Sequence, residues 1–482
     1  MISSPSNSNH VYQFRADILF VILVGIFAVL VGVLIAIVGG VIPFLVYSLP
    51  VAAAMIFFDY RIGVWLLVVL LPFASTQLVP RQVFGVTGLN PLNILLVLTL
   101  LSLFAASLLR RRVIRLVRLP RVLLVYIAVI AFAAYVGTGS AERAITIPGV
   151  DTEPLTVTTY LLDYFAKPMI IFVVAWLAAV FARNGNGRPL IWALAIAFVV
   201  FVVLIAGYIV TNGISLEILA SSQTRGFLGW TGMHANEVGL MANLGFAILL
   251  YTAVATGGPL PRLILFACAA AAAIMAALTF SRGAFIGLTI ILGYYLLTRR
   301  HMGQFLIALS IIVGTGLILP DAFVERAMTG FQTANTYAIT AGRLDDIWRP
   351  LLPTFWEAPI IGHGLSSTLW ATPNLRGAML PVGHPHSAYL GVLLDLGMVG
   401  VAVVAAFFLS VWVMFRRLSK DHVDLQWRGV FEGGMVCLVC LAAQGLTDDR
   451  FVPTYPQVPL WLCYGLALGH AQFTHLSNKK QL

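Results

Sequence analysis

Long apolar runs, separated by short polar breaks, recur from one end of the 482-residue chain to the other. Runs of about 17 to 25 apolar residues have the length that an α-helix needs to cross the hydrocarbon core of a bilayer. In lipid, the backbone N–H and C=O groups must form hydrogen bonds within the protein, which only helices and closed barrels achieve. These runs are too long and too uniformly apolar for the strands of a membrane barrel. The pattern therefore predicts an all-α, polytopic bundle of transmembrane helices.

About fourteen spans fit this pattern. The alternative is about twelve, because Pro43, Pro50 and Pro72 interrupt the second and third runs. The expected spans are residues 17–39, 41–58, 62–79, 91–109, 122–138, 160–182, 189–211, 236–255, 262–280, 284–298, 303–320, 387–415, 429–446 and 456–474. Either even count places both termini on the same side of the membrane.

Composition agrees with a membrane protein and argues against other classes. Hydrophobic residues make up 60% of the chain and charged residues 10%, whereas globular domains carry roughly 25% charged residues. The net charge of +10 does not indicate nucleic-acid binding, because the basic residues are scattered over short loops. All four cysteines, Cys268, Cys437, Cys440 and Cys463, fall within apolar runs, so they are expected to be core residues without a metal or disulfide role.

The distribution of basic residues predicts the orientation. If the N-terminus is cytoplasmic, most of the 29 lysines and arginines, including the cluster in residues 110–121, lie on the cytoplasmic side. Exceptions on the outer side are Arg81, Arg143, Lys167, Arg225, Arg282, Arg326, Arg343, Arg349, Arg376 and Arg450. Most acidic residues are also expected outside, where residues 321–385 form the longest connection, and long connections in compact proteins are usually functional.

Two histidines follow this connection directly, in the segment GHPHSAYLGVLLDLGMVG at residues 383–400. The apolar run that begins at Ala388 would pack equally well without His384 and His386. His386 is therefore a candidate general base, and His384 a candidate for orienting it. The alternative is that both imidazoles only cap the helix in the interfacial zone.

Single arginines on the side opposite the basic clusters suggest an anionic ligand. Arg225 lies in TRGFLG, Arg282 in TFSRGA, and Arg343 in GRLDDIW within the long connection. Arginine stays charged, binds phosphate oxygens through two parallel hydrogen bonds, and is costly near hydrocarbon. A lipid pyrophosphate would fit these residues. The alternative is that each arginine extends to the lipid headgroups.

Together these motifs resemble the bacterial O-antigen ligases and O-antigen polymerases. His386-Ser387, a nine-residue spacer, then Gly397 and Gly400 are similar to the ligase pattern of His-Asn/Ser/Gln followed by Gly-x-x-Gly. The segments around Arg225, Arg282 and Arg343 and the turn at residues 362–364 resemble the shared core of both groups. The similarity covers roughly residues 225–400, with Ser387 where Asn is common.

The resemblance implies a helical glycosyltransferase of the membrane C superfamily in the bacterial inner membrane, with a periplasmic active site and cytoplasmic termini. Arg225 and Arg282 would bind the undecaprenyl pyrophosphate of the glycan donor, and His386 would activate the acceptor hydroxyl. His384, Arg343, Asp345 and Asp346 are weaker candidates for binding or orienting the acceptor, which is lipid A-core or a lipid-linked oligosaccharide. The family is expected to use no metal and no cofactor.

The resemblance also divides the chain into three regions. Residues 1–220 would be N-terminal transmembrane helices, residues 221–415 the ligase-like core with the periplasmic loop 321–385, and residues 416–482 C-terminal transmembrane helices. Ligation to lipid A-core would be inverting and metal-independent, and the alternative activity is polymerisation of O-antigen or exopolysaccharide repeats. A lipid-linked glycan transporter is the alternative from a different class, but it should place ionisable groups near the bilayer midplane.

Overall fold

The computed structural model describes residues 56, 59–80, 82–83, 86–88, 90–109, 114–145, 154–185, 187–215, 228–299, 336–371, 380, 383–420, 424–447 and 450–479. The elements, with η for a 3-10 or π-helical turn, are α3 (Tyr60–Leu70), η1 (Leu71–Phe73), β1 (Gln82–Val83), β2 (Val86–Thr87), α4 (Pro91–Leu109), α5 (Arg121–Thr138), η2 (Ala141–Arg143), α6 (Val157–Leu161), η3 (Leu162–Ala166), α7 (Lys167–Arg183), α8 (Arg188–Thr211), α10 (Ala235–Ala255), α11 (Pro259–Leu278), α12 (Arg282–Arg299), α15 (Thr336–Thr340), η5 (Arg343–Trp348), α16 (Arg349–Phe355), η6 (Ser367–Trp370), α18 (Ala388–Leu418), α19 (Leu425–Gln444), η7 (Tyr455–Gln457) and α20 (Val458–Lys479).

The predicted polytopic helical architecture is confirmed. Within the described residues, 8 helices are long and apolar enough to cross a membrane: Pro91–Leu108, Arg121–Thr138, Val157–Arg183, Arg188–Thr211, Ala235–Ala255, Pro259–Leu278, Ala388–Leu418 and Leu425–Gln444. Each overlies an expected span. Shorter apolar helices occupy Tyr60–Phe73 and Arg282–Thr298, and α20 takes the place of the last expected span. The spans expected at 17–39 and 303–320, and all of 41–58 except Ile56, lie outside the described residues.

The span expected at 62–79 is shorter than predicted. Helix α3 gives way at Leu71 to the 3-10 turn η1, whose second residue is Pro72, because proline cannot continue the helical hydrogen-bond ladder. Beyond it, β1 and β2 form a two-stranded antiparallel hairpin with Gln82 opposite Thr87. The sequence pattern gave no sign of this hairpin.

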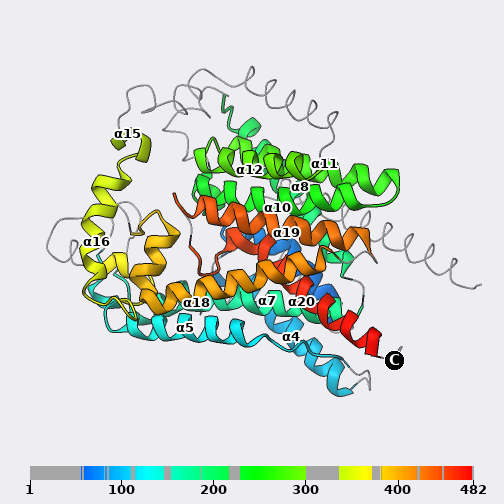
Figure 1. Ribbon diagram of the computed structural model, residues 1–482, viewed down its shortest axis with the longest axis horizontal. Coiled ribbons are helices and arrows are strands. Elements are labelled where there is room, and N and C mark those ends of the chain that lie inside the picture. The colour runs from blue at the N-terminus through cyan, green and yellow to red at the C-terminus, as the bar shows by residue number, and fades with distance from the viewer. Residues whose placement is uncertain are drawn as a thin grey trace, which may run out of the picture.

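Two closely packed helix pairs form the centre of the bundle. Helix α19 lies along α10, as Figure 1 shows, and α20 packs against α7. Both α19 and α20 carry glycines four residues apart, at Gly429 and Gly433 and at Gly465 and Gly469. A Cβ atom on Gly465 would lie 2.1 Å from the Ala175 carbonyl oxygen, and one on Gly433 would lie 2.7 Å from Ile248 Cα. Small residues at this spacing let the helix backbones touch, which is how helices associate where lipid removes the hydrophobic driving force.

Helix α18 is too long to be one membrane span. Its 31 residues would extend about 46 Å, against a hydrocarbon core of about 30 Å. The helix breaks at Gly397, where φ is 64° and ψ is −168°. The part after the break, residues 398–418, still has about the length required to cross the membrane. The part before the break projects from the bundle beside α16 (Figure 1).

The backbone groups released by this break are satisfied by residues 359–364. Hydrogen bonds run from His363 N to Leu394 O (2.9 Å), Gly364 N to Asp395 O (3.1 Å), Met398 N to Pro359 O (2.9 Å) and Val399 N to Ile360 O (3.1 Å). A Cβ atom on Gly397 would lie 2.5 Å from the carbonyl carbon of Ile360, so only glycine fits both the conformation and the space. The loop and the break therefore form one unit.

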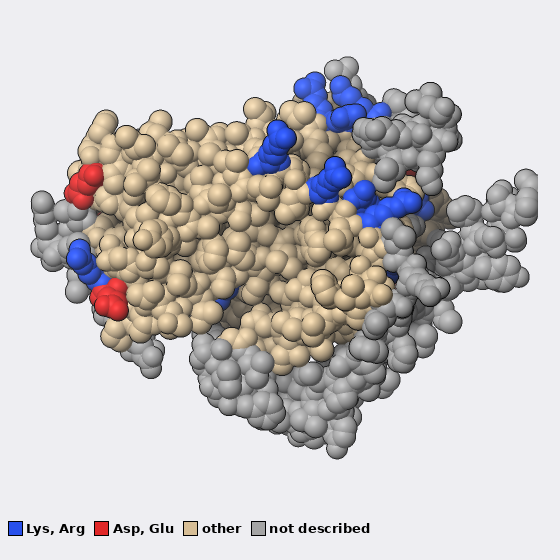
Figure 2. Space-filling view, turned by 90° about the horizontal axis from the view of Figure 1, so that it is seen from below, with Lys and Arg blue, Asp and Glu red and all other residues tan. Residues whose placement is uncertain are grey.

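Charged side chains are separated along the length of the bundle. On the face shown in Figure 2, most of the lysine and arginine side chains gather toward one end, and the most prominent carboxylate patches lie at the other. The end of α18 carries Arg416 and Arg417, and residues 114–120 lie beside the last residues of α7, where Asn184 pairs with both backbone groups of Arg115 at 2.8 and 2.9 Å. We call this the basic end. The opposite end, which holds His384 and His386, we call the histidine end.

Candidate active site

The two histidines lie in a tight turn that leads into α18. His386 has a left-handed backbone, with φ at 48°, and the imidazole rings of His384 and His386 are 3.9 Å apart between centroids. Ser387 follows in an extended conformation and caps the helix, its hydroxyl accepting from Leu390 N at 3.4 Å. The Trp348 indole holds the turn from outside by donating to Pro385 O at 2.8 Å. A non-glycine residue in this conformation stores strain, which is common at functional sites.

The C-terminal end of α19 brings the histidine turn close to the start of α12. Gly445 accepts a hydrogen bond from Ala388 N at 2.7 Å, and the preceding residue, Gln444, donates its side-chain amide to Gly283 O at 2.5 Å. Arg282, half-buried, is the first residue of α12, and His386 lies two residues before α18 begins. Gln444, the last residue of α19, and Gly445, its C-cap, thus hold the residue after the predicted phosphate-binding arginine and the start of the helix that follows the predicted base.

The turn before α12 is equally well fixed. Phe280 has a φ of 47°, and the Ser281 hydroxyl hydrogen-bonds to the Asn236 side-chain oxygen at 2.5 Å, which ties this turn to the first turn of α10. Asn243, fully buried on α10, donates its amide to Ala284 O at 2.9 Å. Polar contacts from α10 therefore hold the turn between α11 and α12 and the first residues of α12.

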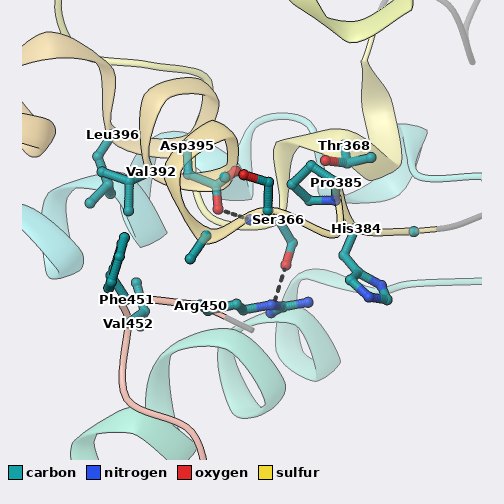
Figure 3. Close-up of a pocket in the computed structure, with 14 residues that line it drawn as sticks. Ser366, Thr368, His384, Pro385, Val392, Asp395, Leu396, Arg450, Phe451 and Val452 are labelled. Carbon is teal, nitrogen blue, oxygen red and sulfur yellow. Dashed lines mark hydrogen bonds between the residues drawn. The ribbon is translucent and has the colours of Figure 1, made fainter. Parts of the chain in front are cut away.

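A pocket opens beside the histidine turn at the first part of α18. It is lined by Ser366, Thr368, Gly383, His384, Pro385, Ser387, Ala388, Gly391, Val392, Asp395, Leu396, Arg450, Phe451 and Val452. Its space, including the part open to solvent, is about 440 Å³. Figure 3 shows the Arg450 side chain extending beneath Ser366. His384 lines the pocket. His386 is not among the lining residues, but its ring contacts that of His384.

Asp395 organises the polar wall of this pocket. Its carboxylate accepts hydrogen bonds from Ser366 N and Ser367 N, both at 2.9 Å, and from the Ser367 hydroxyl at 2.7 Å. Ser366 is held in a left-handed conformation, with φ at 62°, and its hydroxyl accepts from the Arg450 guanidinium at 3.2 Å. The same guanidinium lies 5.4 Å from the centre of the Tyr164 ring. Asp395 therefore sets the shape of the loop that faces Arg450.

The other predicted residues lie in different surroundings. Arg343, Asp345 and Asp346 belong to η5, the turn that also carries Trp348. Asp345 forms an ion pair with Arg349 at 2.5 Å, and Asp346 accepts from the Tyr337 hydroxyl at 2.8 Å. This hydrogen bond raises the pKa of Tyr337. The described contacts therefore join η5 to the histidine turn through Trp348.

Arg225 lies outside the described residues, so its position is not given by the structure. In the part of the chain that is described, no group of three or more His, Cys, Asp and Glu side chains lies together as a metal-binding cluster. Metal independence stays a prediction.

The sequence interpretation missed Asp395 and the serines that it binds. One signal was available, because Asp395 is the only acidic residue in the apolar run AYLGVLLDLGMVG, and a carboxylate in such a run usually has a functional or structural partner. The identity of that partner was not visible. Ser366 is about thirty residues away, and only the fold brings the two together.

A comparison with known families bears on this site. The O-antigen ligase family matches residues 266–405, a segment that contains Arg282, η5, both histidines and the break at Gly397. Arg450 lies outside it. No curated protein matches the chain. The matched segment coincides with much of the predicted core, and over residues 266–405 the chain is similar to the O-antigen ligase family.

Proposed function

We propose that the protein is a membrane glycosyltransferase that moves a glycan from undecaprenyl pyrophosphate to an acceptor hydroxyl at the histidine end. One observation carries this proposal. Within residues 266–405, the segment that matches the O-antigen ligase family, Gly283 next to Arg282 is hydrogen-bonded to Gln444, and Ala388, two residues after His386, is hydrogen-bonded to Gly445. The chain segments that carry the proposed pyrophosphate-binding arginine and the proposed base thereby meet at the end of α19, which supports the proposal.

His386 is the proposed general base. A neutral imidazole near pH 7 can accept the proton of an acceptor hydroxyl as its oxygen attacks the anomeric carbon of the glycan. The new C–O bond forms while the bond between that carbon and the pyrophosphate oxygen breaks, and the electron pair leaves with the pyrophosphate. Attack from the face opposite the leaving group inverts the anomeric configuration. His384, in contact with His386, would orient the base or the acceptor.

Arg282 and Arg225 are the proposed pyrophosphate-binding residues. Negative charge grows on the leaving oxygen as the glycosidic bond breaks, and guanidinium groups fixed in advance stabilise it without later reorganisation. The anchoring of α12 by Ser281 and by Gln444 supports such a fixed position for Arg282. Arg343, Asp345 and Asp346 are proposed to contribute to the acceptor side through the turn that Trp348 joins to Pro385.

The charge separation of the bundle supports a location in the bacterial inner membrane with the histidine end in the periplasm and both termini in the cytoplasm. Basic residues favour the cytoplasmic side, and most of those visible in Figure 2 lie toward the basic end. Lipid A-core is the proposed acceptor, which would make the protein a ligase. The end of another lipid-linked repeat would instead make it a polymerase acting through the same residues.

The arrangement favours an enzyme over a lipid-linked glycan transporter. Transporters place their binding groups near the bilayer midplane on broken helices. Here the break at Gly397 leaves about a full span of helix on its far side, so the histidine turn lies toward one surface.

Glycosyl transfer by purified protein in nanodiscs, with a lipid-linked glycan and each acceptor in turn, tests the proposal. His386→Ala should slow transfer by about two to four orders of magnitude, the usual cost of removing a general base. Binding of the lipid-linked glycan should persist, because the arginines remain. His384→Ala, the matched control in the same turn, should have the smaller effect on rate, and EDTA should leave wild-type turnover unchanged.

Three outcomes would count against this assignment. Full activity of His386→Ala would show that His386 is not the general base. Loss of transfer on EDTA treatment, restored by a metal ion, would show that the arginines do not act alone on the pyrophosphate. Movement of intact lipid-linked glycan across the membrane, without any transfer, would favour the transporter.

A further inference from the structure

The pocket beside the histidine turn has two chemically different walls. One wall carries hydroxyl, guanidinium and imidazole groups, from Ser366, Thr368, Arg450 and His384. The other is apolar and includes Val392, Leu396, Phe451 and Val452. Pockets for small ligands commonly combine an apolar lining with a few convergent polar groups that set orientation. This combination suits a ligand with a hydroxyl-bearing edge and a hydrocarbon face.

The charges of the polar wall offset one another. Burial of Asp395 favours its neutral form, and against this the three hydrogen-bond donors that converge on the carboxylate, together with the Arg450 guanidinium, favour the ionised form. Ser366 links the two groups, donating its backbone N–H to Asp395 and accepting from Arg450 through its hydroxyl. A wall with a balanced cation and anion favours an uncharged polar ligand over a phosphate, which would meet the carboxylate as well.

The guanidinium retains hydrogen-bonding capacity. Arginine has five N–H donors, and among the described residues Arg450 uses one of them, on Ser366 Oγ. Its backbone is fixed independently, since Arg450 O accepts from the Gln457 side chain. Phe451, next in the chain, is held edge-on against the Tyr389 ring at 4.9 Å. The donors and the apolar wall are thus both positioned without a ligand.

We propose that this pocket is the subsite for the uncharged terminal sugar ring of the acceptor. Arg450, Ser366 and Thr368 hydrogen-bond its hydroxyl groups, and Phe451 and Val452 cover its C–H face. His384 bridges the subsite to His386, so that one ring hydroxyl lies toward the base. The inference rests on the proposed glycosyl transfer and adds the residues that select the acceptor, three of which, Arg450, Phe451 and Val452, lie outside the matched residues 266–405.

Two substitutions test the subsite with little disturbance of the fold. Arg450→Gln removes the charge and keeps side-chain hydrogen-bond donors. Ser366→Gly removes the hydroxyl, and glycine accepts the left-handed backbone that Ser366 adopts. Arg143→Ala is the matched control, because Arg143 is an exposed arginine on η2, which packs against η6. Steady-state transfer then gives separate KM values for the acceptor and for the lipid-linked glycan.

Arg450→Gln should raise the acceptor KM about 10- to 100-fold, the loss expected for one charged hydrogen bond, and Ser366→Gly should raise it by about threefold to tenfold. The KM for the lipid-linked glycan should stay within about twofold, and Arg143→Ala should match wild type. An unchanged acceptor KM in both pocket variants would overturn the subsite. A rise confined to the KM for the lipid-linked glycan would also overturn it, because the pocket would then serve the pyrophosphate.

Direct binding separates this inference from the proposed function. A lipid-free acceptor oligosaccharide, stripped of its phosphates, should bind wild-type protein in nanodiscs and bind Arg450→Gln more weakly, whether or not transfer occurs. Inorganic pyrophosphate should not compete with it. Displacement of the sugar by pyrophosphate, or equal binding to both proteins, would contradict the subsite. Wild-type protein that binds the sugar but transfers nothing would contradict the glycosyltransferase and leave the subsite standing.

Discussion

The helix pairs at the centre of the bundle and the histidine end both depend on glycine, but for different physical reasons. In α19 and α20 glycine is needed for its size, because the backbones of α10 and α7 lie where a Cβ atom would be. At Gly397 and Gly362 glycine is also needed for its conformation, with φ values of 64° and 72°. The first use keeps helices regular and close, and the second interrupts one.

This difference separates the central helix pairs from the part that carries the proposed active site. Continuous helices satisfy their own backbone groups, so the centre of the bundle needs few polar contacts beyond its small residues. The broken part of α18 depends on residues 359–364 for its hydrogen bonds and on Asp395 to shape the next loop. The site is therefore assembled from interactions between distant segments, which local changes can disrupt while the frame stays folded.

The largest effect is expected where space and conformation both require glycine. Gly397→Ala would place its Cβ atom 2.5 Å from the carbonyl of Ile360 at a positive φ, costing about 4 kcal/mol from backbone strain and overpacking together. Thermal unfolding in detergent and transfer activity should both fall. Gly88→Ala is the control. Gly88 has a φ of 86° and open space around it, so this variant should lose stability only through backbone strain. Equal unfolding temperatures for the two variants would contradict the steric part of this account.

A smaller loss is expected at the central helix pairs. Gly465→Ala would put its Cβ atom 2.1 Å from the Ala175 carbonyl oxygen, which is backbone and cannot swing away. Separation of α20 from α7 should cost about 3 kcal/mol and lower the unfolding temperature, while the protein that remains folded transfers glycan at its normal rate. Gly207→Ala on α8, where nothing lies within 4 Å, should be neutral or slightly stabilising. A loss of turnover in the folded fraction of Gly465→Ala would show that the central helix pairs also affect the proposed active site.

The smallest effect on stability is expected at Asp395. In Asp395→Asn one oxygen can still accept, but the new NH₂ group must face the backbone N–H of Ser366 or Ser367, at a cost of about 1–2 kcal/mol. The loop beside the pocket should loosen, and the acceptor KM should rise more than the unfolding temperature falls. Ser367→Ala, which removes only the hydroxyl bond to the same carboxylate, should show a weaker version of the same change. A normal acceptor KM in Asp395→Asn would show that the hydrogen bonds between Asp395 and the serines do not shape the pocket.

Hydropathy was enough to predict the fold class and the eight long described spans, although the span expected at 62–79 ends early at Pro72. The resemblance also singled out Gly397 and Gly400, but the sequence did not show that Gly397 breaks the helix. The Gly-x-x-x-Gly spacings in α19 and α20 were available in the sequence and were not used. The division at residues 220 and 415 stays a prediction.

The site was only partly predictable. The sequence singled out His384 and His386 because two titratable groups precede an apolar run, and Arg282 because it is a single arginine on the side opposite the basic clusters. The roles of Asp395, Ser366 and Arg450 depend on hydrogen bonds between segments far apart in the chain. No local pattern encodes such pairs, since each residue alone fits a loop or a helix.

The double attachment at the end of α19 has a mechanical consequence. Bilayers of different thickness change the tilt of a membrane helix. Because Gln444 holds the start of α12 and Gly445 holds the start of α18, a tilt of α19 carries Arg282 and His386 in the same direction. The separation between the proposed pyrophosphate-binding arginine and the proposed base would thereby change little with lipid chain length, because both segments move with α19.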